Sequence, residues 1–123
     1  MNKRKKKILI IDDSPTVAIT LQMHLEDDGY KIIKASDGLT GLKKIRATMP
    51  DLVISDLMLP GIDGYEVCKR TKDDPATCSI PFIFLTGKEY CAHSHNGTKR
   101  AEYYITKPYD IDSLLKKIHE ITE

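Results

Sequence analysis

Five short apolar runs, separated by longer polar or amphipathic stretches, constrain the fold of this chain most strongly. Each run is continuous rather than alternating and is rich in branched or aromatic side chains, which is typical of strands buried on both faces of a parallel sheet. The runs cover residues 8–11, 32–35, 52–55, 82–85 and 103–106. They predict five parallel strands.

Helix signals lie between the runs. Ser14 is a candidate N-cap, Pro15 suits the first helical position, and apolar residues then recur every four positions until Gly29 ends the helix. Leu39, Leu42 and Ile45 predict a second helix that ends before Pro50, and residues 65–71 a shorter third. The alternation of strands and helices predicts one α/β domain, a doubly wound parallel sheet with helices on both faces.

The last two inter-strand segments differ sharply from each other. A helix capped by Asp110 or Asp112 is the clearest in the chain, because its apolar residues share one face: Ile111, Leu114, Leu115, Ile118 and Ile121. Residues 88–100 carry no apolar stripe and contain an Asn-Gly turn, so we expect a short or irregular fourth helix there.

Composition excludes several classes of protein. The 123 residues are enough for one domain, and no apolar run approaches the roughly 18 residues of a membrane span. The net charge of +1 conceals a basic stretch at residues 3–7, which leaves 14 basic and 18 acidic side chains in the rest. We interpret residues 1–6 as a solvated tail, with no nucleic-acid or membrane partner. Three cysteines without a leader peptide favour a reducing, cytoplasmic location.

Polar side chains follow four of the predicted strands. They are Asp12 and Asp13, Asp56, Thr86, and Lys107. Because ligands of such folds bind outside the carboxyl ends of the strands, we expect these residues to converge at one edge. Three clustered carboxylates repel one another unless a cation offsets their charge, and oxygen ligands of this kind suit Mg²⁺, or Mn²⁺ in its place.

The same residues fit phosphoryl chemistry. A carboxylate can attack phosphorus and form an aspartyl phosphate, with a metal, a lysine and a hydroxyl to neutralise the phosphoryl oxygens. Asp56, Lys107 and Thr86 are the candidates for the nucleophile, the cation and the hydroxyl.

Four ordered motifs carry a resemblance to a known family. They read ILIIDDS at residues 8–14, DLMLPGIDG at 56–64, TG at 86–87 and YITKP at 104–108. This arrangement resembles the receiver domain of two-component response regulators, the CheY-like superfamily, over residues 7–123. The resemblance implies the flavodoxin-like strand order 2-1-3-4-5.

The resemblance also implies a role for each residue at the strand ends. Asp56 accepts a phosphoryl group from a sensor histidine kinase or a histidine phosphotransfer protein. Asp13 and Asp56 bind Mg²⁺ directly, Asp12 acts through a water, and the backbone carbonyl of Met58 completes the protein ligands. Lys107 contacts the phosphoryl oxygens.

The resemblance also implies a switch, a cis peptide bond, an output route and an oligomeric state. Thr86 and Tyr104 form the conformational switch, because the threonine hydroxyl moves to the phosphoryl group and the tyrosine ring turns into the vacated space. The peptide bond between Lys107 and Pro108 is commonly cis in this family. Output passes to a downstream effector or a fused output domain, and the domain is a monomer or a weak dimer that depends on phosphorylation.

Other functions remain as alternatives. A pseudo-receiver would keep the fold and signal without phosphate, but it usually lacks an acidic or lysine position, and none is lost here. A phosphohydrolase usually has a second aspartate two residues after its nucleophile, where this chain has Met58. We therefore expect a regulatory phosphoacceptor with slow autodephosphorylation, and no activity on a separate substrate.

One weaker signal lies in the irregular segment. Cys91, His93 and His95 offer soft ligands for Zn²⁺ or Cu²⁺, but no fourth ligand is near them in the sequence. We interpret this stretch as a solvated loop.

Overall fold

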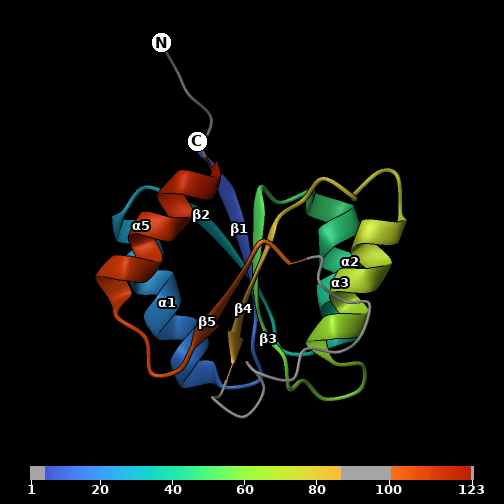
Figure 1. Ribbon diagram of the computed structural model, residues 1–123, viewed down its shortest axis with the longest axis horizontal. Helices are drawn as coiled ribbons and strands as arrows, with labels where there is room; N and C mark the ends of the chain where they lie inside the picture. The colour runs from blue at the N-terminus through green and yellow to red at the C-terminus, as the bar shows by residue number, and fades with distance from the viewer. Residues whose placement is uncertain (1–4, 87–100, 123) are drawn as a thin grey trace.

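The computed structural model describes residues 5–86 and 101–122, and its centre is a five-stranded parallel sheet (Figure 1). The strands are β1 (Lys7–Ile11), β2 (Lys31–Ala35), β3 (Leu52–Asp56), β4 (Phe82–Thr86) and β5 (Tyr103–Thr106). Their order is β2-β1-β3-β4-β5, with parallel pairing between neighbours. The predicted fold class and strand order are confirmed.

Helices cover both faces of this sheet. In the described part of the chain, α1 (Pro15–Asp27) and α5 (Ile111–Thr122) lie on one face, and α2 (Gly38–Thr48) and α3 (Gly64–Asp73) on the other (Figure 1). The prediction for residues 88–100 lies outside the described residues. None of the described helices combines the length and the apolar character that a bilayer crossing requires.

Each of these helices begins beside a side chain that accepts a hydrogen bond from a backbone N–H of its first turn. Such caps satisfy donors that have no partner inside the helix. The acceptor and donor pairs are Ser14–Val17 (3.4 Å), Asp37–Thr40 (2.7 Å), Asp63–Glu66 (2.9 Å) and Asp110–Ser113 (3.1 Å). The predicted cap at Ser14 is confirmed, and Asp110 rather than Asp112 caps the last helix.

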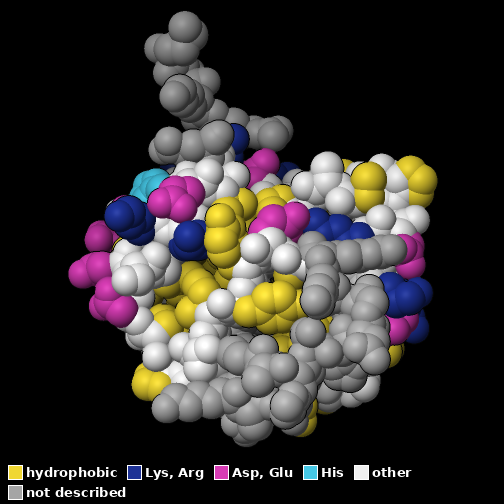
Figure 2. All heavy atoms as spheres, in the orientation of Figure 1, with side chains coloured by type: hydrophobic (Ala, Val, Ile, Leu, Met, Phe, Trp, Pro, Cys, Tyr) yellow, Lys and Arg dark blue, Asp and Glu magenta, His cyan; other side chains and the backbone are white. Residues whose placement is uncertain are grey.

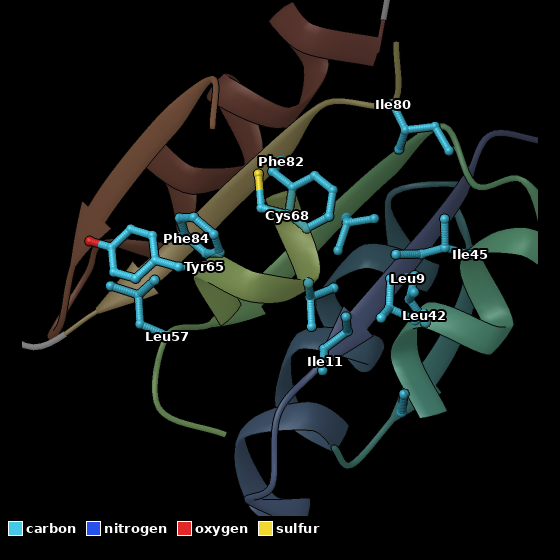
Figure 3. Close-up of a cluster of buried hydrophobic side chains, with 13 residues drawn as sticks. Leu9, Ile11, Leu42, Ile45, Leu57, Tyr65, Cys68, Ile80, Phe82 and Phe84 are labelled. Carbon is cyan, nitrogen blue, oxygen red and sulfur yellow. The ribbon is translucent and has the colours of Figure 1, made fainter. Parts of the chain in front are cut away.

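Two apolar cores fill the space between the sheet and its helices. Alternate residues of β1 enter different cores: Leu9 and Ile11 pack on the side of α2 and α3 (Figure 3), whereas Ile8 and Ile10 pack on the side of α1 and α5. The strand is therefore buried on both faces, as its continuous apolar run predicts.

The outer side of β5 is only partly covered in the described residues. Figure 2 shows apolar side chains gathered in the middle of this face of the molecule, with charged side chains around them. Tyr103 is one of the exposed large apolar residues, and the Lys117 ammonium lies 4.2 Å from the centre of its ring. This cation–π contact links β5 to α5.

Candidate functional site

Three carboxylates meet at the carboxyl edge of the sheet, the edge to which the β4 arrow points in Figure 1. Asp12 and Asp13 follow β1, and Asp56 is the last residue of the neighbouring strand β3. Each offers an oxygen within 4.8 Å of the oxygens of the other two. The predicted convergence of these side chains is present.

Asp12 is the most buried of the three, with 4% of its surface exposed. Its Oδ1 accepts a hydrogen bond of 2.9 Å from the backbone N–H of Ser14. Burial is the largest cause that raises the pKa of its carboxyl group, and the negative charges of Asp56 and Asp13 raise it further. The Ser14 bond and Lys107 oppose this effect without cancelling it. Burial and the neighbouring carboxylates therefore both disfavour the charged form of Asp12.

The Asp56 carboxylate is close both to the carboxylates of Asp12 and Asp13 and to the ammonium of Lys107. Its Oδ2 is 3.4 Å from the Lys107 ammonium, and its Oδ1 accepts a 3.2 Å hydrogen bond from the backbone N–H of Met58. Only 16% of the Asp56 side chain is exposed, against 33% for Lys107. One carboxylate oxygen of Asp56 thus faces a positive charge at a partly open position.

Lys107 reaches Asp56 from the loop that follows β5. The Lys107–Pro108 peptide bond is cis, the isomer implied by the family resemblance. The next residue, Tyr109, packs on the core beside α1 and α5. Burial and the negative charge of Asp12 raise the pKa of its phenol. Tyr109 therefore lies near the acidic cluster, which no motif at position 109 indicated.

Gly64 packs closely against the backbone of Asp56. Its backbone N–H donates a 2.9 Å hydrogen bond to the carbonyl of Leu57, and a Cβ placed on it would lie only 2.4 Å from the Asp56 carbonyl oxygen. No side chain fits this approach. A glycine therefore lets the first turn of α3 lie directly against the end of β3.

The remaining predicted residues lie on β4 and β5. Thr86 ends β4 opposite Thr106, but its side chain is outside the described part of the structure. The ring of Tyr104 is half-buried, with its centre 5.4 Å from that of Phe84. Cys91, His93 and His95 also lie outside the described residues.

The donor set fits a hard divalent cation. Three carboxylates provide oxygen ligands only and crowd within one site, and burial, followed by the charges of Asp56 and Asp13, raises the pKa of Asp12. Mg²⁺ prefers such ligands and retains coordination positions for water or phosphate oxygens. The residues present are therefore suited to hold it.

A family model of the response regulator receiver domain matches residues 8–119. The chain belongs to this family. Its fold is likewise that of solved receiver proteins. The chemotaxis response regulator CheY4 of Vibrio cholerae has a TM-score of 0.87 at 27% identity, and the alignment covers 96% of this chain and 99% of CheY4.

Two further proteins are similar to this chain over nearly their whole length. The response regulator TrrA of Thermotoga maritima, solved in complex with Mg²⁺ and BeF, has a TM-score of 0.83 at 32% identity, with 94% of this chain and 98% of TrrA covered. Protein PilH of Pseudomonas aeruginosa is 36% identical over 94% of this chain and 96% of its own length.

A longer relative shows that such domains also occur within larger proteins. The DNA-binding dual master transcriptional regulator RpaA of Synechocystis sp. is 36% identical over 94% of this chain. The present chain spans about half of that relative, 48% of its length. The DNA binding named for RpaA is therefore a property of that protein.

Proposed function

We propose that Asp56 is the phosphoacceptor of this receiver domain and that it takes its phosphoryl group from a phosphohistidine on a sensor kinase or a phosphotransfer protein. The observation that carries the proposal is the position of its carboxylate, within an acidic cluster on one side and 3.4 Å from the Lys107 ammonium on the other. A carboxylate held in this way is partly exposed, oriented and close to a positive charge.

The transfer needs few groups from the protein. An oxygen of Asp56 bonds to phosphorus as the bond from phosphorus to the donor histidine nitrogen breaks, and the nitrogen keeps the electron pair. The Lys107 ammonium neutralises charge on the phosphoryl oxygens. Asp13, Asp56 and the Met58 carbonyl would hold Mg²⁺ directly and Asp12 through a water, and the ion would supply further charge neutralisation. Slow hydrolysis of the acyl phosphate resets the domain.

Thr86 and Tyr104 convert phosphorylation of Asp56 into a conformational change. The Thr86 hydroxyl binds the new phosphoryl group, and the Tyr104 ring occupies the inner position beside Phe84. Support comes from the packing of Tyr104, whose ring lies 5.4 Å from that of Phe84 between centres. A single added group thereby biases a two-state element.

The wider role follows the family. The partners are a histidine kinase or phosphotransfer protein, and an effector or fused output domain. The domain acts in the cytoplasm as a monomer or as a weak dimer that depends on phosphorylation. The similarity to TrrA, which was solved with Mg²⁺, supports Mg²⁺ as the cofactor.

Labelling by acetyl phosphate tests the proposal. With Mg²⁺ present, the intact mass should increase by one phosphoryl group, and the label should be stable in acid and labile in base. Asp56→Asn should prevent the increase. Asp51→Asn, at the opposite end of β3, is the matched control and should label normally. A wild-type chain that takes no label would instead support the pseudo-receiver alternative.

A further inference from the structure

An aromatic cluster connects the first turn of α3 to β5. The ring centres of Tyr65 and Phe84 are 5.5 Å apart with their edges facing, and those of Tyr65 and Tyr104 are 6.5 Å apart. Figure 3 shows Tyr65 beside Phe84 and Leu57 in the core between the sheet and α3. Tyr104 therefore rests against two rings from two different elements.

Tyr65 is also attached to the Asp56 loop. It follows Gly64, the residue whose backbone packs directly against the Asp56 carbonyl and donates a hydrogen bond to Leu57. A displacement of the peptide after Asp56 must move Gly64, because no space separates them. Such a displacement therefore reaches the ring of Tyr65 without passing through Thr86.

The hydroxyl of Tyr65 lies inside the core rather than at its surface. The residue is 6% exposed and its hydroxyl oxygen is buried. After burial, the phenol of Tyr65 is the next largest cause that raises the pKa of Tyr104 to about 12. The two phenols thus interact in a region of low polarity, where the effect of one polar group on another is strong.

We propose that Tyr65 is a positioning residue of the switch, which couples the Asp56 loop to the ring of Tyr104 and favours the inner position of that ring. The inference rests on the proposed roles of Asp56 and Tyr104. Tyr65→Phe keeps the ring and removes only the hydroxyl. An effect of this variant therefore separates a positioning role of the hydroxyl from the packing of the ring.

The test uses Tyr65→Phe, Tyr104→Phe and the double variant. Tyr30→Phe is the matched control, because Tyr30 is also 6% exposed but lies in the other core, where its hydroxyl meets Thr122. All chains carry fluorotyrosine, and Tyr104→Phe assigns the ¹⁹F resonance of Tyr104. The second readout is the rate at which acetyl phosphate labels Asp56 with Mg²⁺ present.

Tyr65→Phe should shift or split the Tyr104 resonance and slow labelling by roughly three- to tenfold, the range for interacting aromatic pairs. In the Tyr104→Phe background the same change should have no further effect on the rate, and Tyr30→Phe should leave both readouts unchanged. An unaltered Tyr104 resonance and rate would overturn the inference. An equal slowing in the Tyr104→Phe background would also overturn it, because the role would then be structural.

Failure of the proposed function gives a different result. If the wild-type chain takes no label, Asp56 is not a phosphoacceptor under these conditions. The Tyr104 resonance in Tyr65→Phe still decides whether the two tyrosines are coupled.

Discussion

Replacing Asp12 with asparagine should stabilise the metal-free protein at neutral pH, although it removes a group from the site. Three carboxylates lie together, and the pKa of Asp12 is raised first by burial and then by Asp56 and Asp13. Asparagine has nearly the same shape, and its side-chain oxygen can still accept the hydrogen bond from Ser14. The change therefore removes a buried charge and leaves the packing in place.

The distances set the size of the effect. At the 4.8 Å limit of the cluster, two carboxylates repel by about 0.9 kcal/mol in a water-like dielectric and by about 3.5 kcal/mol at an effective dielectric constant of about 20. Lys107 offsets part of this repulsion. We expect Asp12→Asn to raise the free energy of unfolding by about 1–2 kcal/mol at pH 7 without Mg²⁺.

The sign of the pH dependence follows from linkage. Because the folded-state pKa of Asp12 lies above the ordinary value of 3.8, the folded protein holds the proton to higher pH than the unfolded chain. The Asp12 contribution to stability therefore falls as pH rises from about 3.8 through the raised pKa, and is constant above it. The advantage of Asp12→Asn should grow across that window.

Urea unfolding, followed by circular dichroism from pH 3 to pH 8, measures this difference. Asp37→Asn is the control, and it should lower the free energy of unfolding at pH 7. Hydrogen bonds from Thr40 lower the pKa of Asp37, so the charged form of this side chain is the favoured one. Mg²⁺ at a hundred times its Kd for the wild type should raise the unfolding free energy of the wild type by about 2.7 kcal/mol. The same Mg²⁺ concentration should stabilise Asp12→Asn less. A lower unfolding free energy for Asp12→Asn at pH 7 without Mg²⁺ would refute the reasoning.

Two pairs of substitutions test the packing. Gly64→Ala should lower the free energy of unfolding by about 1–3 kcal/mol and slow labelling, because its Cβ would meet the Asp56 carbonyl oxygen at 2.4 Å. Gly29→Ala, with no atom within 4 Å of the added Cβ, should strain only its own backbone and leave labelling unchanged. In urea titrations, Ile118→Ala should cost about 2–5 kcal/mol because Ile118 is fully buried, whereas exposed Ile19→Ala should cost about 0.5 kcal/mol or less. Equal slowing of labelling in the two glycine variants, or equal losses of unfolding free energy in the two isoleucine variants, would contradict the assigned packing.

Much of the fold could be predicted because the central strands β1, β3 and β4 are runs of buried, mostly apolar residues. The edge strands β2 and β5 are not buried on both faces, since Lys34 and Tyr103 are exposed. The ends of the elements were less predictable, since hydrogen bonding rather than hydrophobicity decides them. Lys7 belongs to β1 because it pairs with Lys31, although both side chains are charged. Gly38 begins α2 despite its poor helix propensity, and a Cβ there would lie 2.5 Å from the Ile62 carbonyl oxygen. Close tertiary approaches of this kind leave no periodic pattern in a sequence.

The same distinction applies to the site. The positions of Asp12, Asp13, Asp56 and Lys107 follow from the rule that parallel strands end at one edge. Tyr65 and Tyr109 could not be found in this way. Position 65 has the pattern of an ordinary helix face, and the approach of Tyr109 to the acidic cluster depends on how the loop after β5 packs.

The most direct test of the account is the chemical identity of the phosphorylated residue. After acetyl phosphate and Mg²⁺ treatment, borohydride should reduce an aspartyl phosphate to homoserine, which peptide mass spectrometry locates by position. The account predicts homoserine at position 56 in the wild type, and none anywhere when Mg²⁺ is withheld or in Asp56→Asn. Homoserine at position 12 or 13 instead, or an equal yield in Asp56→Asn, would contradict it.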